Sequence, residues 1–201
     1  MLDILKQTST MVGEYLILPA LIGIGIGIYK FIKSWIIRQK LFHSVTWNNE
    51  KNITINQILS EFLVTSNASR VYLSMFHNGD KYIDGSPIIK FTRISEVCAP
   101  GISHETQYYK DVPASFITEI IKELEKDAPE IIVVEGMDAS SYKMKLINEG
   151  VVYTMVCPVV INKSIVGMVG LDFITNDVPC VTKSDADHYL FRLSEVLRRK
   201  K

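Results

Sequence analysis

The most continuous apolar stretch of the chain lies near its N-terminus. Residues 15–37 are almost all apolar, and their only charges are Lys30 and Lys33, close to one end. A helix needs about 20 such residues to cross the hydrocarbon core of a bilayer, and lysines near its end can extend to the headgroups. The pattern predicts one N-terminal transmembrane helix over residues 15–37, preceded by a short segment, residues 1–14.

Basic residues flank this stretch unevenly. Its C-terminal side carries Lys30, Lys33, Arg38 and Lys40, whereas Lys6 alone stands upstream. Basic residues tend to stay on the cytoplasmic side, so we expect the C-terminal bulk of the chain in the cytosol, anchored to the inner (cytoplasmic) membrane. A cleaved signal peptide is the alternative, but no small-residue cleavage site follows the apolar run.

Glycines recur inside the apolar stretch. Gly23 and Gly27 are four residues apart, a spacing that lets two helix backbones approach closely, although glycine is also simply common in membrane helices. We therefore expect a homo-oligomer. The mostly polar residues 38–51 are predicted to connect the membrane helix to a domain.

From residue 52 onward, apolar positions switch between helical and extended spacing. Helical spacing falls near residues 55–63, 116–124 and 186–197, and Thr182 and Asp185 are a candidate capping pair for the last of these helices. A further helix is expected between the candidate caps Asp138, Ser140 and Ser141 and a terminating Gly150. Apolar and β-branched runs that favour strands fall at residues 71–76, 88–97, 131–134, 151–160 and 165–173. The last two strands flank a tight turn, so we expect their hairpin at the centre of a sheet. This order predicts an α+β domain over residues 52–201, an antiparallel sheet flanked by helices.

Composition narrows the classes of partner. The 22 Lys and Arg residues balance 22 Asp and Glu residues, so the chain has no basic surplus for a phosphate backbone, and no nucleic acid is expected. The three cysteines, Cys98, Cys157 and Cys180, are odd in number and widely spaced. This favours reduced thiols in the cytosol over a disulfide framework.

Polar and aromatic side chains concentrate in two predicted loops, residues 77–87 and 100–112, and on the strand between them. The first loop carries Asn78-Gly79 and Asp84-Gly85, and its backbone is expected to turn at each. Small-ligand sites are mostly apolar pockets with a few converging polar groups. The predicted ligand-binding residues are His77, Asn78, Asp80, Tyr82, Lys90, Arg93, Glu96, Tyr108 and Tyr109. Lys90 and Arg93 fall on opposite faces of a strand, so at most one points inward, where it would favour an anionic ligand.

Other interpretations of these residues remain open. The side chains from His77 to Asp80 could simply end a strand through hydrogen bonds to the backbone. His77, Asp80 and Asp84 could be imagined as metal ligands, but no paired Cys or His spacing accompanies them, so no metal is expected. The sequence also shows no Ser-His-Asp arrangement and no phosphate-binding glycine loop, so we predict no catalytic residue and no enzyme.

The order of elements and the stretch from Gly150 to Asp172 resemble the GAF domain, a relative of PAS domains. Gly150-Val151 leads into a strand with Pro158-Val159, and the next strand carries Gly167 and Gly170-Leu171-Asp172. The resemblance covers about residues 52–199. It implies a GAF/PAS-like sheet with the terminal helices on one face, a ligand cavity on the other, and a sensory or adaptor role. Residues 76–80 are also similar to membrane-anchored GAF-like proteins of tailed phages.

The chain departs from some members of that family. The Asn-Lys-Phe-Asp-Glu signature of cyclic-nucleotide-binding GAF domains is missing, because Asn162-Lys163 is followed by Ser164-Ile165. Cyclic nucleotides are therefore not implied, and the cofactor is unknown. Some reductases that use cysteine thiols also have a GAF fold. The resemblance therefore leaves open a thiol reductase activity, in which Cys98 or Cys180 would be the reactive residue.

These patterns together predict the role of the chain. We expect a membrane-anchored sensory or adaptor module that binds a small molecule or an unidentified protein partner. The second hypothesis is a membrane scaffold or interaction protein, encoded by a phage, that keeps the fold without a ligand. The third hypothesis is the thiol reductase.

Overall fold

The computed structural model describes residues 18–81, 85–126 and 128–198, in two compact units, Met1–Asn49 and Glu50–Lys201. The first three residues of the predicted membrane span, 15–17, lie outside the described residues. Of the helices that the structure describes, none has the length and apolar character needed to span a bilayer. Helix α2 (Leu18–Ser66) includes residues 38–51, predicted as a connector, and these residues contain no glycine or proline that would interrupt a helix.

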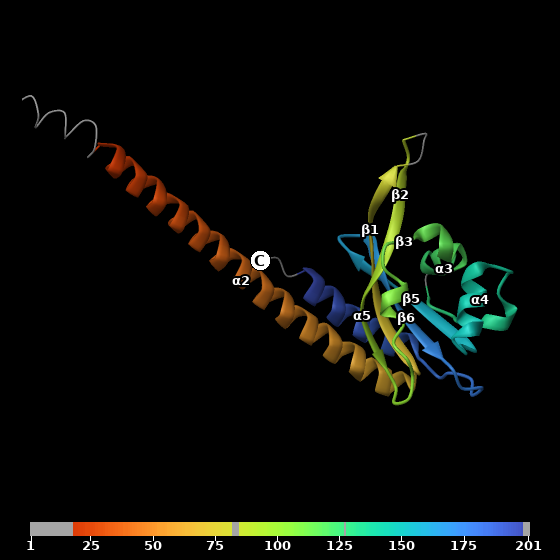
Figure 1. Cartoon of the computed structure of the whole chain (residues 1–201). Coiled ribbons are helices and arrows are strands. Elements are labelled where there is room, and N and C mark those ends of the chain that lie inside the picture. The colour runs from red at the N-terminus through yellow and green to blue at the C-terminus, as the bar shows by residue number, and fades with distance from the viewer. Residues whose placement is uncertain (1–17, 82–84, 127, 199–201) are drawn as a thin grey trace, which may run out of the picture. The chain divides into compact units, whose positions relative to one another are not determined.

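The second unit is built on an antiparallel sheet (Figure 1). The strands that the structure describes are β1 (Arg70–Lys81), β2 (Pro87–Cys98), β3 (Val112–Pro113), β4 (Ile131–Val133), β5 (Tyr153–Ile161) and β6 (Ser164–Phe173), in the order β3-β2-β1-β6-β5-β4. Strand β6 lies beside β1 in the middle of the sheet, which confirms the predicted central hairpin. Asn162 and Lys163 both have positive φ, 51° and 65°, as the tight hairpin turn requires.

The terminal helices cover one face of this sheet. Within the domain, α2 contributes Ile55, Leu59 and Phe62 to a core that also includes Leu171, and all four side chains are at most 1% exposed. Helix α5 (Lys183–Arg198) packs into the same core. Its start is fixed by reciprocal hydrogen bonds between Thr182 and Asp185, which confirms the predicted capping pair.

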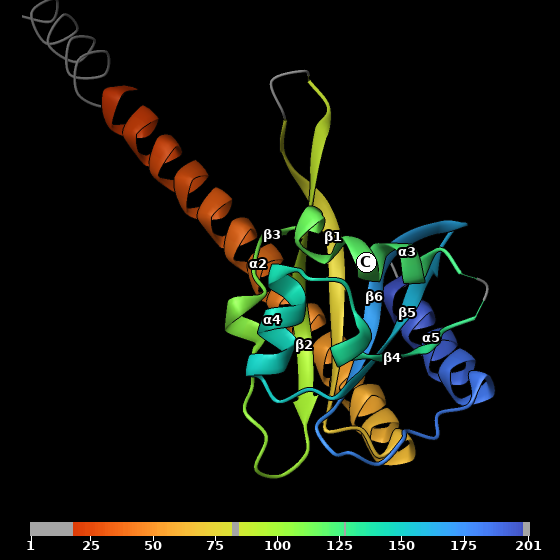
Figure 2. The same cartoon turned by 90° about the vertical axis from the view of Figure 1, so that its right-hand side faces the viewer.

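Short helices and irregular segments cover the opposite face (Figure 2). These are η2 (Thr106–Tyr108), η3 (Ala114–Ile117), α3 (Thr118–Leu124), η4 (Val134–Gly136) and α4 (Ser141–Asn148). They enclose a second core around Phe91, Ile120 and Leu146. Helix α4 begins at a Ser140 side chain that accepts a hydrogen bond from the Lys143 amide, as the sequence predicts.

Strands β1 and β2 continue past the rest of the sheet as a two-stranded arm (Figures 1 and 2). Strand β1 pairs with β6 only as far as Met75, whereas its pairing with β2 continues to Lys81. The prediction of a turn at Asn78-Gly79 is wrong, because both residues lie within β1. Gly79 is instead needed at a close approach, since a Cβ atom there would lie 2.8 Å from the Ile88 carbonyl oxygen.

Candidate ligand-binding site

A pocket of about 650 Å³ opens where β1 and β6 cease to pair. Met75 and Gly167 form the last pair, and beyond them the β1–β2 arm stands away from the β5–β6 hairpin. Helix α3 and the preceding η3 supply another wall. The apolar lining consists of Phe76, Ile89, Ala114, Ile121, Leu124, Ile165 and Val166. This volume lies within the range of about 300–1,000 Å³ that is usual for small-molecule sites.

Polar groups are few in this pocket and come from separate elements. Asn78 comes from the arm, Ser115 and Thr118 from the start of the α3 segment, and Glu125 from its end. Two lining side chains, Ile89 and Ile165, are 41% and 42% exposed. Apolar surface left open beside a few hydrogen-bonding groups is typical of a site that an apolar ligand covers.

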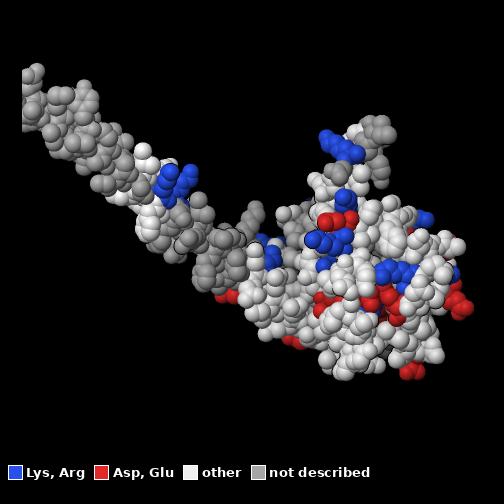
Figure 3. Space-filling model, viewed as in Figure 1, with Lys and Arg blue, Asp and Glu red and all other residues white. Residues whose placement is uncertain are grey.

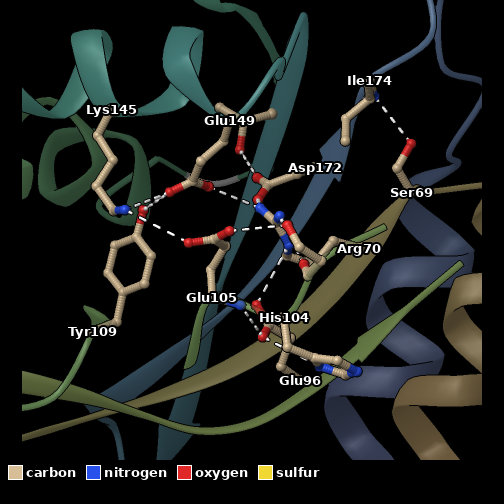
Figure 4. Close-up of polar contacts among 12 residues, drawn as sticks. Ser69, Arg70, Glu96, His104, Glu105, Tyr109, Lys145, Glu149, Asp172 and Ile174 are labelled. Atoms are coloured by element: carbon tan, nitrogen blue, oxygen red, sulfur yellow. Dashed lines mark hydrogen bonds and ion pairs between the residues drawn. The ribbon is translucent and has the colours of Figure 1, made fainter. Parts of the chain in front are cut away.

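The same sheet face holds a buried ionic network at the end where β1 begins and β2 ends (Figure 4). Arg70 on β1 is only 1% exposed. Its Nη1 lies 2.8 Å from Glu149 Oε2, at the C-terminal end of α4, and 3.2 Å from Asp172 Oδ2 on β6. Its Nη2 donates to the Ser103 carbonyl oxygen at 3.2 Å. One side chain therefore ties α4 and the loop after β2 to the sheet.

Arg93 occupies the sheet face beside this network. Its guanidinium carbon lies 3.7 Å from the centre of the Tyr72 ring and 3.9 Å from that of Tyr109. Its Nη1 donates to Glu96 Oε1. Glu96 Oε2 in turn accepts the backbone N–H groups of Glu105, at 2.7 Å, and Thr106, at 3.0 Å. The inward-facing arginine is thus already matched by a carboxylate of the chain itself.

The pKa shifts in the network follow from burial and from these charges. Burial by itself would lower the pKa of Arg70, but Asp172, Glu149 and Glu96 outweigh it and raise that pKa. Burial raises the pKa of Asp172 against the opposing effects of Arg93 and Arg70. For Glu96, burial is outweighed by Arg93 and by hydrogen bonds from Thr106 and Glu105, so its pKa is lowered. The network is an ion-paired structural unit.

A second, polar hollow of about 1120 Å³ lies along α4. Its lining includes Tyr108, which is 59% exposed, and Lys145. The Lys145 ammonium stands 4.8 Å from the centre of the Tyr108 ring and 2.7 Å from Glu149 Oε1. Because its charged groups already pair with one another, this hollow offers a ligand less than the apolar pocket does.

The predicted ligand residues on β1 and the start of β2 lie near the pocket. His77 and Asn78 line it. The His77 Nε2 atom lies 3.0 Å from Thr92 Oγ1. Asp80 lies further along the arm, Lys90 pairs with His77 across it, and Tyr82 lies outside the described residues.

The remaining predicted residues lie elsewhere. Arg93, Glu96 and Tyr109 belong to the buried network, and Tyr108 faces the polar hollow. The structure therefore divides the described members of the predicted set between three places: the pocket with its arm, the buried network and the polar hollow. Sequence reasoning missed Arg70, which carries no distinctive motif, and also missed Ser115 and Thr118 in the pocket.

Figure 3 shows basic groups along the β1–β2 arm with acidic atoms among them, and acidic and basic groups intermingled near α4. Lys81 and Lys90 are the lysines of the arm's described strands. Among the described residues that line the pocket beside the arm, the one carboxylate is that of Glu125, on the α3 side.

No protein-family model and no curated protein matches the chain. Solved structures do match. The blue-light absorbing form of the PixJ GAF domain of Thermosynechococcus elongatus is 13% identical, with a TM-score of 0.54 over 75% of this chain and 84% of that one. The GAF domain/HD domain protein of Geobacter sulfurreducens is 12% identical, with a TM-score of 0.52 over 73% and 88%.

A third match is the phycocyanobilin-bound GAF domain of a cyanobacterial phytochrome. It is 14% identical, with a TM-score of 0.54 over 79% of this chain and 90% of that one. The element order, the terminal helices on one sheet face and these matches agree: the domain has the GAF fold. The resemblance noted in the sequence is confirmed at the level of the fold.

Proposed function

We propose that the chain is a sensory or adaptor module whose GAF-fold domain binds a small molecule in the pocket between α3 and strands β1, β2 and β6. The observation that carries this proposal is the pocket itself, of about 650 Å³, with an apolar lining and few polar groups. The rest of that sheet face is filled by the chain's own core and ionic network, so the pocket is the best place for a ligand.

The lining indicates the class of ligand. Phe76, Ile121 and Val166 favour an apolar body, and the side chains of Asn78 and Thr118 offer hydrogen bonds to a polar end. An anionic ligand is disfavoured, because Glu125 places a carboxylate in the pocket lining. Arg93 does not offset this charge, since it forms an ion pair with Glu96. We therefore favour a neutral or cationic amphipathic molecule.

The cellular setting of the proposal comes from the sequence. The apolar residues 15–37 and the basic residues after them support an anchor in the inner membrane with the domain in the cytosol. Gly23 and Gly27 support pairing of two copies. In this setting, ligand binding would change how the domain binds a partner protein.

A pocket-blocking substitution tests ligand binding. A panel of metabolites is expected to contain compounds that raise the thermal midpoint of the chain, because a ligand that binds only the folded state stabilises it. Thr118→Trp, which places an indole in the pocket, should abolish that rise. Lys122→Trp, on the same helix but outside the pocket lining, should retain it. Differential scanning fluorimetry measures all three proteins.

The scaffold hypothesis has its own support in the structure. Arg93 sits between Tyr72 and Tyr109, so this part of the domain is packed without any ligand. A scaffold predicts that no compound of a broad panel stabilises the chain, while stable oligomers persist in the membrane. Equal stabilisation of the parent chain and Thr118→Trp would also argue against the pocket.

Thiol catalysis receives no support from Cys157 or Cys98. Cys157 is fully buried in the core, and burial raises the pKa of its thiol to about 12. Burial, followed by the charge of Glu96, also raises the pKa of Cys98. A thiolate is the reactive form of cysteine, so we propose a binding role rather than an enzymatic one.

A further inference from the structure

Three potential metal ligands from β2 and the following loop converge at one end of the sheet. Glu96 and Cys98 are two residues apart on β2 and share a face. The chain then turns back through Gly101, whose φ is +85°, and brings His104 against both. One atom from each of the three side chains can be chosen so that all three lie within 4.8 Å of one another.

Two of the three separations are close to those of a tetrahedral metal centre, and the third, between Glu96 and Cys98, is at most 4.8 Å. Cys98 Sγ lies 3.7 Å from His104 Nδ1, and the same nitrogen lies 3.5 Å from Glu96 Oε2. In zinc sites the metal is about 2.3 Å from sulfur and about 2.0–2.2 Å from nitrogen or oxygen, which places tetrahedral ligands about 3.3–3.6 Å apart. Small side-chain movements would therefore complete the coordination.

We propose that Glu96, Cys98 and His104 bind a divalent metal ion of the zinc class, with water as the fourth ligand. The mixed sulfur, nitrogen and oxygen donors are those that zinc prefers. Cys98 is partly buried, whereas the His104 side chain is 67% exposed, so an ion can enter from solvent.

The surrounding charges accommodate such an ion. Arg70, Arg93 and Lys145 face four carboxylates, those of Glu96, Glu105, Glu149 and Asp172, which leaves this group with a net charge of −1. A Cys98 thiolate would bring the group to −2, which a divalent cation neutralises. Metal binding would release the thiol proton to solvent.

Hydrogen bonds already hold the loop in place for coordination. Glu96 Oε2 accepts the backbone N–H groups of Glu105 and Thr106 and also the Thr106 hydroxyl. Ligation by this oxygen would displace the hydroxyl, which can rotate, and would keep the backbone contacts that position His104.

The geometry fits a metal centre better than a catalytic thiol. A histidine that activates a nucleophile uses one ring nitrogen for that group and the other for the orienting carboxylate. Here a single nitrogen, His104 Nδ1, faces both Cys98 Sγ and Glu96 Oε2. A common point between the three atoms is where a metal ion would lie.

Titration of the full-length chain with Co²⁺ tests the proposal. The expected result is thiolate-to-cobalt charge-transfer absorption in the near ultraviolet that Zn²⁺ abolishes. Cys98→Ser should remove this absorption. His104→Gln should weaken Co²⁺ binding by more than about 100-fold, because losing a group that only orients a metal ligand already lowers metal affinity by about 10- to 100-fold. Cys180→Ser, which removes an exposed cysteine elsewhere, should bind as the parent does.

Absence of the charge-transfer band in the parent chain would overturn the proposal, as would an unchanged band in Cys98→Ser. Loss of the band in Cys180→Ser would do the same, because the thiol ligand would then lie elsewhere. Since His104 is exposed, His104→Gln should unfold at the parent's temperature without metal, which separates lost binding from lost folding. Thr118→Trp should bind Co²⁺ normally, so this test is independent of the ligand pocket.

Discussion

Arg70→Met is expected to lower the free energy of unfolding by about 3–5 kcal/mol, the usual cost of removing one partner from a buried ion pair. Methionine nearly preserves the volume of the side chain but leaves Asp172, which is fully buried, without its Arg70 hydrogen bond. Glu149 loses the same partner. Urea unfolding followed by circular dichroism measures the change.

Arg192→Met provides the matched control. Arg192 pairs with Glu61 at the surface of the terminal helices, where the two side chains are 35% and 52% exposed. Exposed ion pairs contribute little to stability, so this variant should unfold almost as the parent does. If Arg70→Met and Arg192→Met unfolded at the same urea concentration, the buried network would not be the unit that holds α4 to the sheet.

Gly170→Val is expected to cost about 3 kcal/mol of folding stability, at the upper end of the usual penalty for overpacking a core. A Cβ atom at Gly170 would lie 2.1 Å from Tyr72 Cζ. The Tyr72 ring cannot easily move aside, because it is 1% exposed and lies against the guanidinium of Arg93. The free energy of unfolding in urea gives the magnitude.

Gly136→Val is the control for this substitution. A Cβ atom at Gly136 meets no other atom within 4 Å. Its substitution should therefore change stability by about 0.5 kcal/mol or less. A cost at Gly170 no larger than at Gly136 would mean that the Tyr72 ring does not pack against β6 as described.

Local sequence signals predicted the fold well where the interaction itself is local. The capping pair of Thr182 and Asp185 and the hairpin turn at Asn162-Lys163 are such cases, because a few adjacent residues determine each geometry. The length of β1 was missed. Residues 77–81 remain extended because they pair with β2, and Asn78-Gly79, a frequent turn dipeptide, gives no sign of that non-local partner.

The site was harder to predict for a physical reason. Ile121 and Leu124 belong to an apolar stripe that indicates core, and only the three-dimensional divergence of β1 from β6 makes them pocket walls. Polar residues chosen as ligand contacts proved in part to contact one another, as Arg93 and Glu96 do. Sequence shows that a polar residue will need a partner, but not whether the chain supplies it.

The two sites proposed for the domain would be occupied independently. The ligand pocket lies at the base of the β1–β2 arm, where Met75 forms the last pair with β6, whereas Cys98 ends β2 beside Arg70. The network around Arg70 stabilises the fold without either occupant. An occupied pocket would mainly affect α3 and the arm.

Hydrogen–deuterium exchange of the full chain, with and without a compound that raises its thermal midpoint, tests the central claim most directly. The account predicts slower exchange in residues 76–78, 114–125 and 164–167, which surround the pocket, and little change along α4. Protection confined to α4 and residues 103–108, which line the polar hollow, would contradict the assignment of the ligand to the pocket between α3 and the sheet.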